Sequence, residues 1–88
     1  MKISSNFTLR NIAGSWVALP VGNAVVDFTG MLTLNESGVL LWRALERGAT
    51  REELLGVLLS EYDVSSEMAE RDVDGFISKL LDAGCIER

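Results

Sequence analysis

The sequence predicts an α+β fold in which three short strands are followed by three helices. The main observation is a change in hydrophobic periodicity at Gly30–Gly38. Before this segment apolar residues recur every second position, as in a half-buried strand, and after it they follow the period of an amphipathic helix. The second observation is a set of capping residues that divides the later part of the chain into three helices with brief connections.

Two alternating segments open the predicted sheet. Phe7–Ile12 alternates apolar and polar residues, Ala13-Gly14-Ser15 supplies a turn, and Trp16–Val21 follows, so the pair is predicted to be a hairpin. Pro20 has no N–H to donate, so we expect it at the end of its strand or at a sheet edge. The apolar run Ala24–Phe28 fits either an extension of the sheet or a connection, and periodicity does not decide between them.

The third strand is predicted over Met31–Leu34. Leu32 and Leu34 lie on one face of it, and Met31 and Thr33 lie on the other. Asn35 then occupies the position of a helix N-cap. Apolar residues cover a broad face of the helix that follows, and Gly48 is placed to end it.

The remaining two helices are marked by their caps. Thr50 and Glu53 have the spacing of a capping box, and the helix that they begin is expected to end near Asp63. Ser65 or Ser66 caps the third helix, which Gly84 should stop. Its apolar positions follow the helical period closely: Ala69, Val73, Phe76, Ile77, Leu80 and Ala83. Cys85-Ile86-Glu87 is too short for an independent element, and we expect it to pack back through Ile86.

Composition excludes several classes of function. The 88 residues, sufficient for one domain over 1–88, carry a net charge of −5, which opposes binding to nucleic acid or to an anionic membrane surface. With no histidine and one cysteine the chain lacks the usual metal ligands and the common general base, and no phosphate-binding glycine motif occurs. We therefore expect no enzyme, no metal and no cofactor. No signal peptide or membrane span is found, so a cytoplasmic location is expected.

The last two helices have helix-turn-helix spacing, which raises the possibility of DNA binding. Residues Ser66–Ala83 nevertheless contain five acidic and only two basic residues, and phosphate would repel such a recognition helix. The geometry is therefore expected to be winged-helix-like with a ligand other than DNA.

An ordered set of residues resembles the PqqD-like family, also called RiPP recognition elements, from about Phe7 to Glu87. The set begins with Leu34-Asn35-Glu36-Ser37-Gly38 and continues with Trp42, Leu45, Asp72-Val73, Phe76, Leu80 and Gly84. Cys85 departs from the leucine common in the family, and Ala24–Thr29 makes a longer connection than in its shortest members.

The resemblance implies a winged-helix-like fold with three antiparallel strands and a role as a non-catalytic peptide chaperone. Such a protein binds the leader of a ribosomally made precursor peptide as an added strand and presents it to a separate enzyme, often a radical SAM protein. Carried over to this chain, the peptide-binding residues are Gly30, Met31, Leu32, Thr33, Leu34, Asp72, Val73, Phe76, Ile77 and Leu80.

Several alternatives stay open at this point. Most of the apolar stripe of the third helix must form core, so only part of it is expected to face a peptide groove. A winged-helix transcriptional regulator is the alternative function, and an interaction module for another enzyme or a sugar-transfer system is a third. The unpaired strand edge also leaves a strand-exchanged homodimer open.

Overall fold

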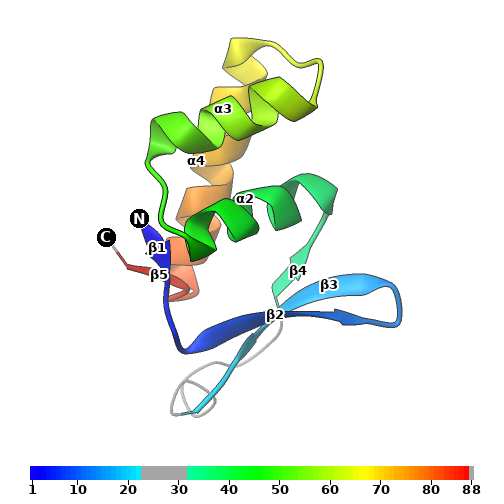
Figure 1. Ribbon diagram of the computed structural model, residues 1–88, viewed down its shortest axis with the longest axis vertical. Coiled ribbons are helices and arrows are strands. Elements are labelled where there is room, and N and C mark those ends of the chain that lie inside the picture. Colours follow the sequence, from blue (N-terminus) through cyan, green and yellow to red (C-terminus); the bar gives the residue numbers. More distant parts are fainter. Residues whose placement is uncertain (23–31, 88) are drawn as a thin grey trace.

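The computed structural model describes residues 1–22 and 32–87, and it has the α+β architecture expected from the sequence (Figure 1). A three-stranded antiparallel sheet in the order β2-β3-β4 lies at one end, and three helices stack beyond it. The elements in chain order are β1 (Lys2–Ile3), β2 (Phe7–Ile12), β3 (Ser15–Pro20), β4 (Leu32–Leu34), α2 (Glu36–Glu46), α3 (Arg51–Glu61), α4 (Ser66–Asp82) and β5 (Ile86–Glu87).

The predicted strands of the sheet are present where the structure describes them, but β3 spans Ser15–Pro20 instead of the predicted Trp16–Val21. β3 ends at Pro20, as the missing N–H of proline suggested. The connecting turn is shorter than expected, because Ser15 already belongs to β3 and only Ala13 and Gly14 form the loop. The undecided run Ala24–Phe28 lies outside the described residues, as do Gly30 and Met31 of the predicted third strand.

All three helix N-caps agree with the sequence. Asn35 Oδ1 accepts from the Gly38 N–H at 2.9 Å, Thr50 and Glu53 form a reciprocal capping box, and Ser65 caps α4. Gly48 and Gly84 follow the ends of α2 and α4 with φ of +88° and +73°, the left-handed conformation that glycine adopts without steric cost.

One prediction about the C-terminal segment is wrong. Residues 86 and 87 form a strand, β5, which pairs antiparallel with β1 through Lys2↔Glu87 and Ile3↔Ile86. Figure 1 shows the two ends of the chain side by side at this small second sheet. Local periodicity could not reveal it, because each strand has only two residues and its hydrogen bonds come from the opposite end of the chain. Ile86 itself is buried, as expected.

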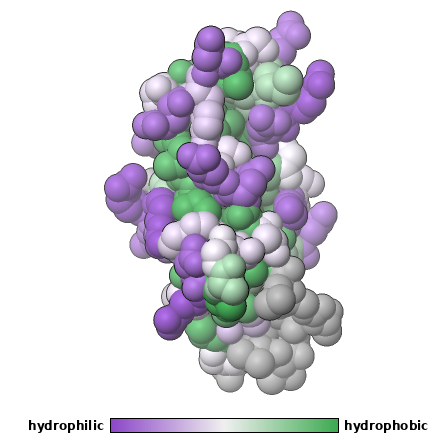
Figure 2. All heavy atoms as spheres, turned by 90° about the vertical axis from the view of Figure 1, so that its right-hand side faces the viewer, coloured by the Kyte–Doolittle hydropathy of each residue, from purple (hydrophilic) through white to green (hydrophobic). Residues whose placement is uncertain are grey.

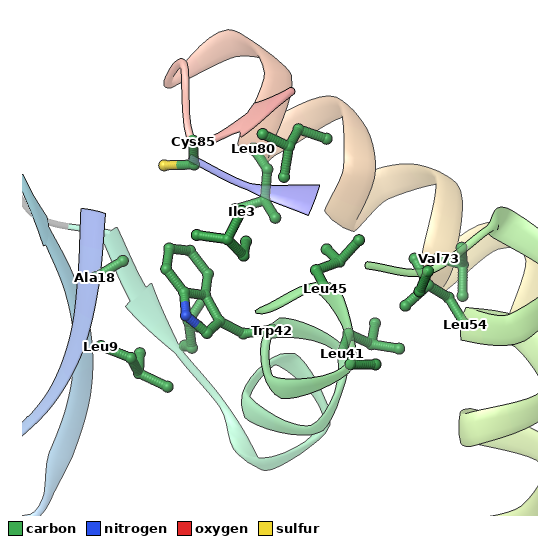
Figure 3. Close-up of a cluster of buried hydrophobic side chains, with 14 of the residues drawn as sticks. Ile3, Leu9, Ala18, Leu41, Trp42, Leu45, Leu54, Val73, Leu80 and Cys85 are labelled. Carbon is green, nitrogen blue, oxygen red and sulfur yellow. The ribbon is translucent and has the colours of Figure 1, made fainter. Parts of the chain in front are cut away.

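The core lies between the sheet and the helices and is centred on Trp42 of α2, which is 0% exposed. In Figure 3 its indole lies between Leu9 and Ala18 of the sheet on one side and the end of α4 on the other, close to Ile3. The side chain therefore joins the layers of the fold. No helix within residues 1–22 and 32–87 combines the length and hydrophobicity needed to cross a lipid bilayer.

Cys85 belongs to this core and is fully buried. Burial raises the pKa of the thiol to about 11 from an ordinary value of 9.0. The thiolate is the reactive form of a cysteine, and a raised pKa lowers the fraction of thiolate at a given pH, so the folded protein should resist alkylation.

We expect iodoacetamide at pH 8 to modify Cys85 at least about 100-fold more slowly in the native protein than in 6 M guanidinium chloride, as measured by mass spectrometry. Equal rates in the two states would contradict a buried thiol.

Candidate functional site

β4 is one of the two edge strands of the three-stranded sheet, since among the described residues it pairs only with β3, and its burial alternates as predicted. Leu32 and Leu34 are buried, and Thr33 between them is exposed. The pairing of β4 with β3 is antiparallel, with Trp16↔Leu34, Val17↔Thr33 and Ala18↔Leu32 as opposite residues. The hairpin that precedes β4 determines which backbone groups of β4 point away from the sheet.

The β2–β3 hairpin fixes the pattern of hydrogen bonds across the sheet. Its two-residue turn has φ of +52° at Ala13 and +86° at Gly14, which is a type I′ turn. In such a hairpin the flanking pair, Ile12↔Ser15, exchanges backbone hydrogen bonds, and every second pair beyond it does the same. The pair Arg10↔Val17 is therefore hydrogen-bonded.

Val17 directs its backbone N–H and C=O toward β2, so its neighbours Trp16 and Ala18 direct theirs toward β4. Trp16 pairs with Leu34 and Ala18 pairs with Leu32, so these two leucines supply the hydrogen bonds between β3 and β4. Thr33 then directs both its N–H and its C=O away from the sheet. The outer edge of β4 thus presents a donor and an acceptor at the same residue, which is the arrangement that another strand can pair with.

A groove of about 560 Å³ lies beside this edge. One wall is formed by Thr33, Leu34 and Asn35, and the other is one face of α4. Ser37, Gly38 and Leu41 of α2 complete it, and the α4 residues are Arg71, Asp72, Gly75, Phe76 and Lys79. The groove therefore combines an unpaired backbone edge with both apolar and charged side chains.

Gly38 allows the two walls to approach each other. A Cβ at this position would lie 3.2 Å from Asn35 Oδ1 and 3.3 Å from Leu34 Cβ, both tighter than ordinary contacts, and 3.4 Å from Phe76 Cε1. In the sequence Gly38 is notable only as part of the run Leu34–Gly38, whereas in the structure its absent side chain is what lets β4, α2 and α4 meet at the base of the groove.

The orientation of α4 is set by its core face and by ion pairs with Arg51 of α3. Ala69, Val73 and Leu80 are 0% exposed. On the outer surface Arg51 donates to both carboxylate oxygens of Asp74, at 2.7 and 2.9 Å, which lowers the pKa of Asp74, and it also lies 3.8 Å from Glu70. Exposed ion pairs contribute little to stability, so core packing dominates and the ion pairs add geometric definition.

The structure brings together only part of the site predicted on α4. Asp72 and Phe76 line the groove. Val73 and Leu80 are fully buried in the core, as the caution about the apolar stripe anticipated. Ile77 is half-buried and lies on the opposite flank of the buried stripe, since successive residues turn by about 100° around a helix. It does not line the groove.

Sequence reasoning missed three groove residues on α4, Arg71, Gly75 and Lys79, and four residues at and after the end of β4, Asn35, Ser37, Gly38 and Leu41. The three residues on α4 share a pattern. They follow each other at i, i+4 and i+8, and this spacing places them on one helix face. The two cations are also the only basic residues of α4. Their spacing and their charges can be read from the sequence, but only the net negative charge of the helix was considered there.

A neighbouring hollow of about 470 Å³ has the opposite charge character. Its lining includes Trp16, Glu36, Glu61 and Tyr62, and it shares Thr33, Leu34 and Asn35 with the groove. Desolvation, followed by Glu36 and Glu61, raises the pKa of Tyr62. Figure 2, which faces the start of α2 and the tip of the hairpin, shows hydrophobic residues along the middle of this side and hydrophilic ones at its margins. This side of the molecule is therefore apolar at its centre and charged at its borders.

The model of the family described as coenzyme PQQ synthesis protein D (PqqD) matches residues 16–86 of the chain. The chain belongs to the PqqD family. The match spans β3, β4, all three helices and the start of β5, so it includes every element that lines the groove. A comparison with curated protein sequences found no match.

Two solved structures share the fold of this PqqD-family chain over nearly its whole length. One is described as TbiB1 in complex with the TbiA(beta) leader peptide, with 28% identity and a TM-score of 0.78, covering 99% of this chain and 95% of that chain. The other is lasso peptide synthetase B1 complexed with the leader peptide, at 22% identity and a TM-score of 0.76, covering 99% and 96%. The second likeness establishes the fold alone.

Proposed function

We propose that this PqqD-family protein is a non-catalytic peptide chaperone. It binds the leader of a ribosomally synthesised precursor peptide as a fourth strand of the sheet and presents the precursor to a separate modifying enzyme. The observation that carries the proposal is the outward N–H and C=O of Thr33 beside a groove between β4 and α4. Strand addition takes its affinity from such backbone groups and its specificity from adjacent pockets. The leader peptides bound to the two structural neighbours support it.

The modifying enzyme has two candidates with different support. The family resemblance of the sequence suggests a radical SAM protein. The description of one structural neighbour names lasso peptide synthesis, so an enzyme of lasso peptide maturation is the second candidate. Affinity capture with the tagged chain, in the presence of precursor peptide, followed by mass spectrometry distinguishes the two.

The proposal is tested by isothermal titration calorimetry with short peptides encoded beside the gene. We expect saturable one-to-one binding that depends on the leader segment and is lost when only the core segment is supplied. Failure of every neighbouring peptide, together with binding to duplex DNA at physiological salt, would favour the alternative of a winged-helix regulator. The net charge of −5 makes the second outcome unexpected.

A homodimer formed through β4 would use the same backbone groups of Thr33. The peptide and a second copy of the chain would then compete for the edge of β4. Adding peptide should therefore convert any such dimer to a complex of one protein chain with one peptide. Light scattering with and without peptide measures this directly. A dimer that keeps its mass at saturating peptide must use another surface.

Gly75 offers a substitution that separates stability from binding. It lies within α4, and a Cβ there would have nothing within 4 Å. Gly75→Ala should therefore raise the free energy of unfolding by about 0.5–1 kcal/mol through helix propensity. The methyl group that this substitution adds also enters the groove, so we expect peptide affinity to fall about fivefold or more, as measured by calorimetry.

The matched control is Gly56→Ala in α3, which also has nothing within 4 Å and does not line the groove. It should stabilise the fold by a similar amount and leave peptide affinity unchanged. If Gly75→Ala binds peptide as tightly as Gly56→Ala does, the peptide does not pass this part of α4.

A further inference from the structure

We infer that the groove selects a leader segment with two acidic residues four positions apart and an apolar residue midway between them. The inference rests on the proposed function and specifies its ligand. It is carried by the placement of Arg71, Gly75 and Lys79 on the wall of α4 that faces the free edge of β4.

The first step concerns the charges. Arg71 and Lys79 are exposed, and neither forms an ion pair within residues 1–22 and 32–87, whereas Arg43 and Arg51 are both engaged with carboxylates. Lys2, Arg10 and Arg47 also lack an ion pair among the described residues, but of these unengaged cations only Arg71 and Lys79 line the groove. Acidic side chains of a bound peptide would give these two cations partners, and the net charge of −5 would disfavour further acidic residues elsewhere in the peptide.

Asp72 is the one acidic residue of the groove. It also lines a smaller hollow with Glu36 and Tyr62, to which Arg71 and Lys79 do not contribute. Asp72 is thus shared with the hollow at the start of α2, whereas Arg71 and Lys79 line the groove but not that hollow. The two cations follow each other at i and i+8 on one face of α4.

The second step concerns spacing. Eight residues separate Arg71 from Lys79, which corresponds to about 12 Å along a helix. A strand advances about 3.3 Å per residue, so the same distance spans about four residues of an extended peptide. Figure 1 shows β4 and α4 both running steeply along the long axis of the molecule, so a strand added to β4 follows α4.

The third step concerns which peptide side chains enter the groove. Side chains alternate along a strand, and residues paired across a sheet point to the same face. The peptide residue opposite exposed Thr33 therefore points away from the core, and its two neighbours point into the groove. Positions i, i+2 and i+4 share that face, which is the face required for contact with both cations.

The middle position then meets Gly75, which lies midway between Arg71 and Lys79. The missing side chain leaves room there, and Leu34, Leu41 and Phe76 provide apolar surface nearby. The preferred segment is therefore acidic-x-apolar-x-acidic. The pattern is symmetric, so it holds for either direction of the added strand.

The test selects peptides from a random 15-residue library displayed on mRNA. We expect the wild-type protein to enrich glutamate or aspartate at i and i+4 with an apolar residue at i+2, and R71E/K79E to lose this pattern in favour of lysine or arginine. The control R10E/R47E carries the same net charge but changes residues outside the groove, so it should enrich the wild-type pattern.

The most enriched wild-type peptide is then titrated at 50 mM and 500 mM NaCl. Replacing its two acidic residues by glutamine should weaken binding about tenfold at low salt and much less at high salt, because exposed ion pairs are weak and screened. Enriched peptides without the acidic pair, or an identical pattern for R71E/K79E, would overturn the inference and leave the proposed function standing. If the library yields no peptide and the encoded precursors also fail to bind, the proposed function itself is wrong.

Discussion

Thr33→Pro is expected to weaken leader-peptide binding by about 100-fold or more while the protein stays folded. Proline removes the outward N–H of Thr33, which leaves a carbonyl of the added strand without a partner, at a cost of about 1–3 kcal/mol. Its ring also occupies space that the incoming strand needs, since paired strands lie about 4.8 Å apart. Calorimetry with the leader peptide measures the loss.

The fold should tolerate this substitution because the hydrogen bonds between β3 and β4 come from Leu32 and Leu34. We expect the free energy of unfolding to change by about 1 kcal/mol or less, as followed by circular dichroism in urea. Thr33→Val is the matched control: it keeps the backbone N–H and the shape of the side chain, so affinity should be retained. A folded Thr33→Pro variant with undiminished affinity would place the peptide on another surface.

Trp42→Ala is expected to have the largest effect on stability, with a loss of about 3–5 kcal/mol. The indole is fully buried and lies between the sheet and the helices, so its removal leaves a cavity that no single element can close (Figure 3). A chain of this length is stabilised by only about 4–13 kcal/mol in total, so the substitution removes a large fraction of the stability. Urea denaturation followed by circular dichroism is the measurement.

Two comparisons make this prediction specific. Trp42→Phe should cost less, about 1–2 kcal/mol, because the buried indole N–H has no hydrogen-bond partner among the described residues and its loss leaves no group unpaired. Trp16→Ala removes an indole from a half-buried site, where Arg43 Cζ lies 5.5 Å from the centroid of the ring. A smaller loss of stability is therefore expected. Equal losses for Trp16→Ala and Trp42→Ala would contradict a core centred on Trp42.

The candidate site was predictable where it depends on local periodicity. Leu32, Thr33 and Leu34 alternate as strand residues do, and Asn35 caps the next helix, so the edge strand and its exposed residue could be predicted. On α4 the apolar stripe was correctly located, but its members divide between core and groove. Val73 is buried and Phe76 lines the groove, a difference that depends on which elements pack against each side of the helix.

The sequence by itself determined the order of the three central strands and the three helices and the positions of the helix caps, and it predicted poor binding to nucleic acid. These depend on neighbours within a few residues or on total charge. Only the tertiary structure decided the pairing of β1 with β5, the close approach at Gly38 and the outward direction of the Thr33 backbone groups. Each of these depends on hydrogen bonds or contacts between elements distant in the chain. For the same reason a helix with net negative charge presents its two cations, Arg71 and Lys79, to a single groove: their position relative to β4 is a property of the packed fold.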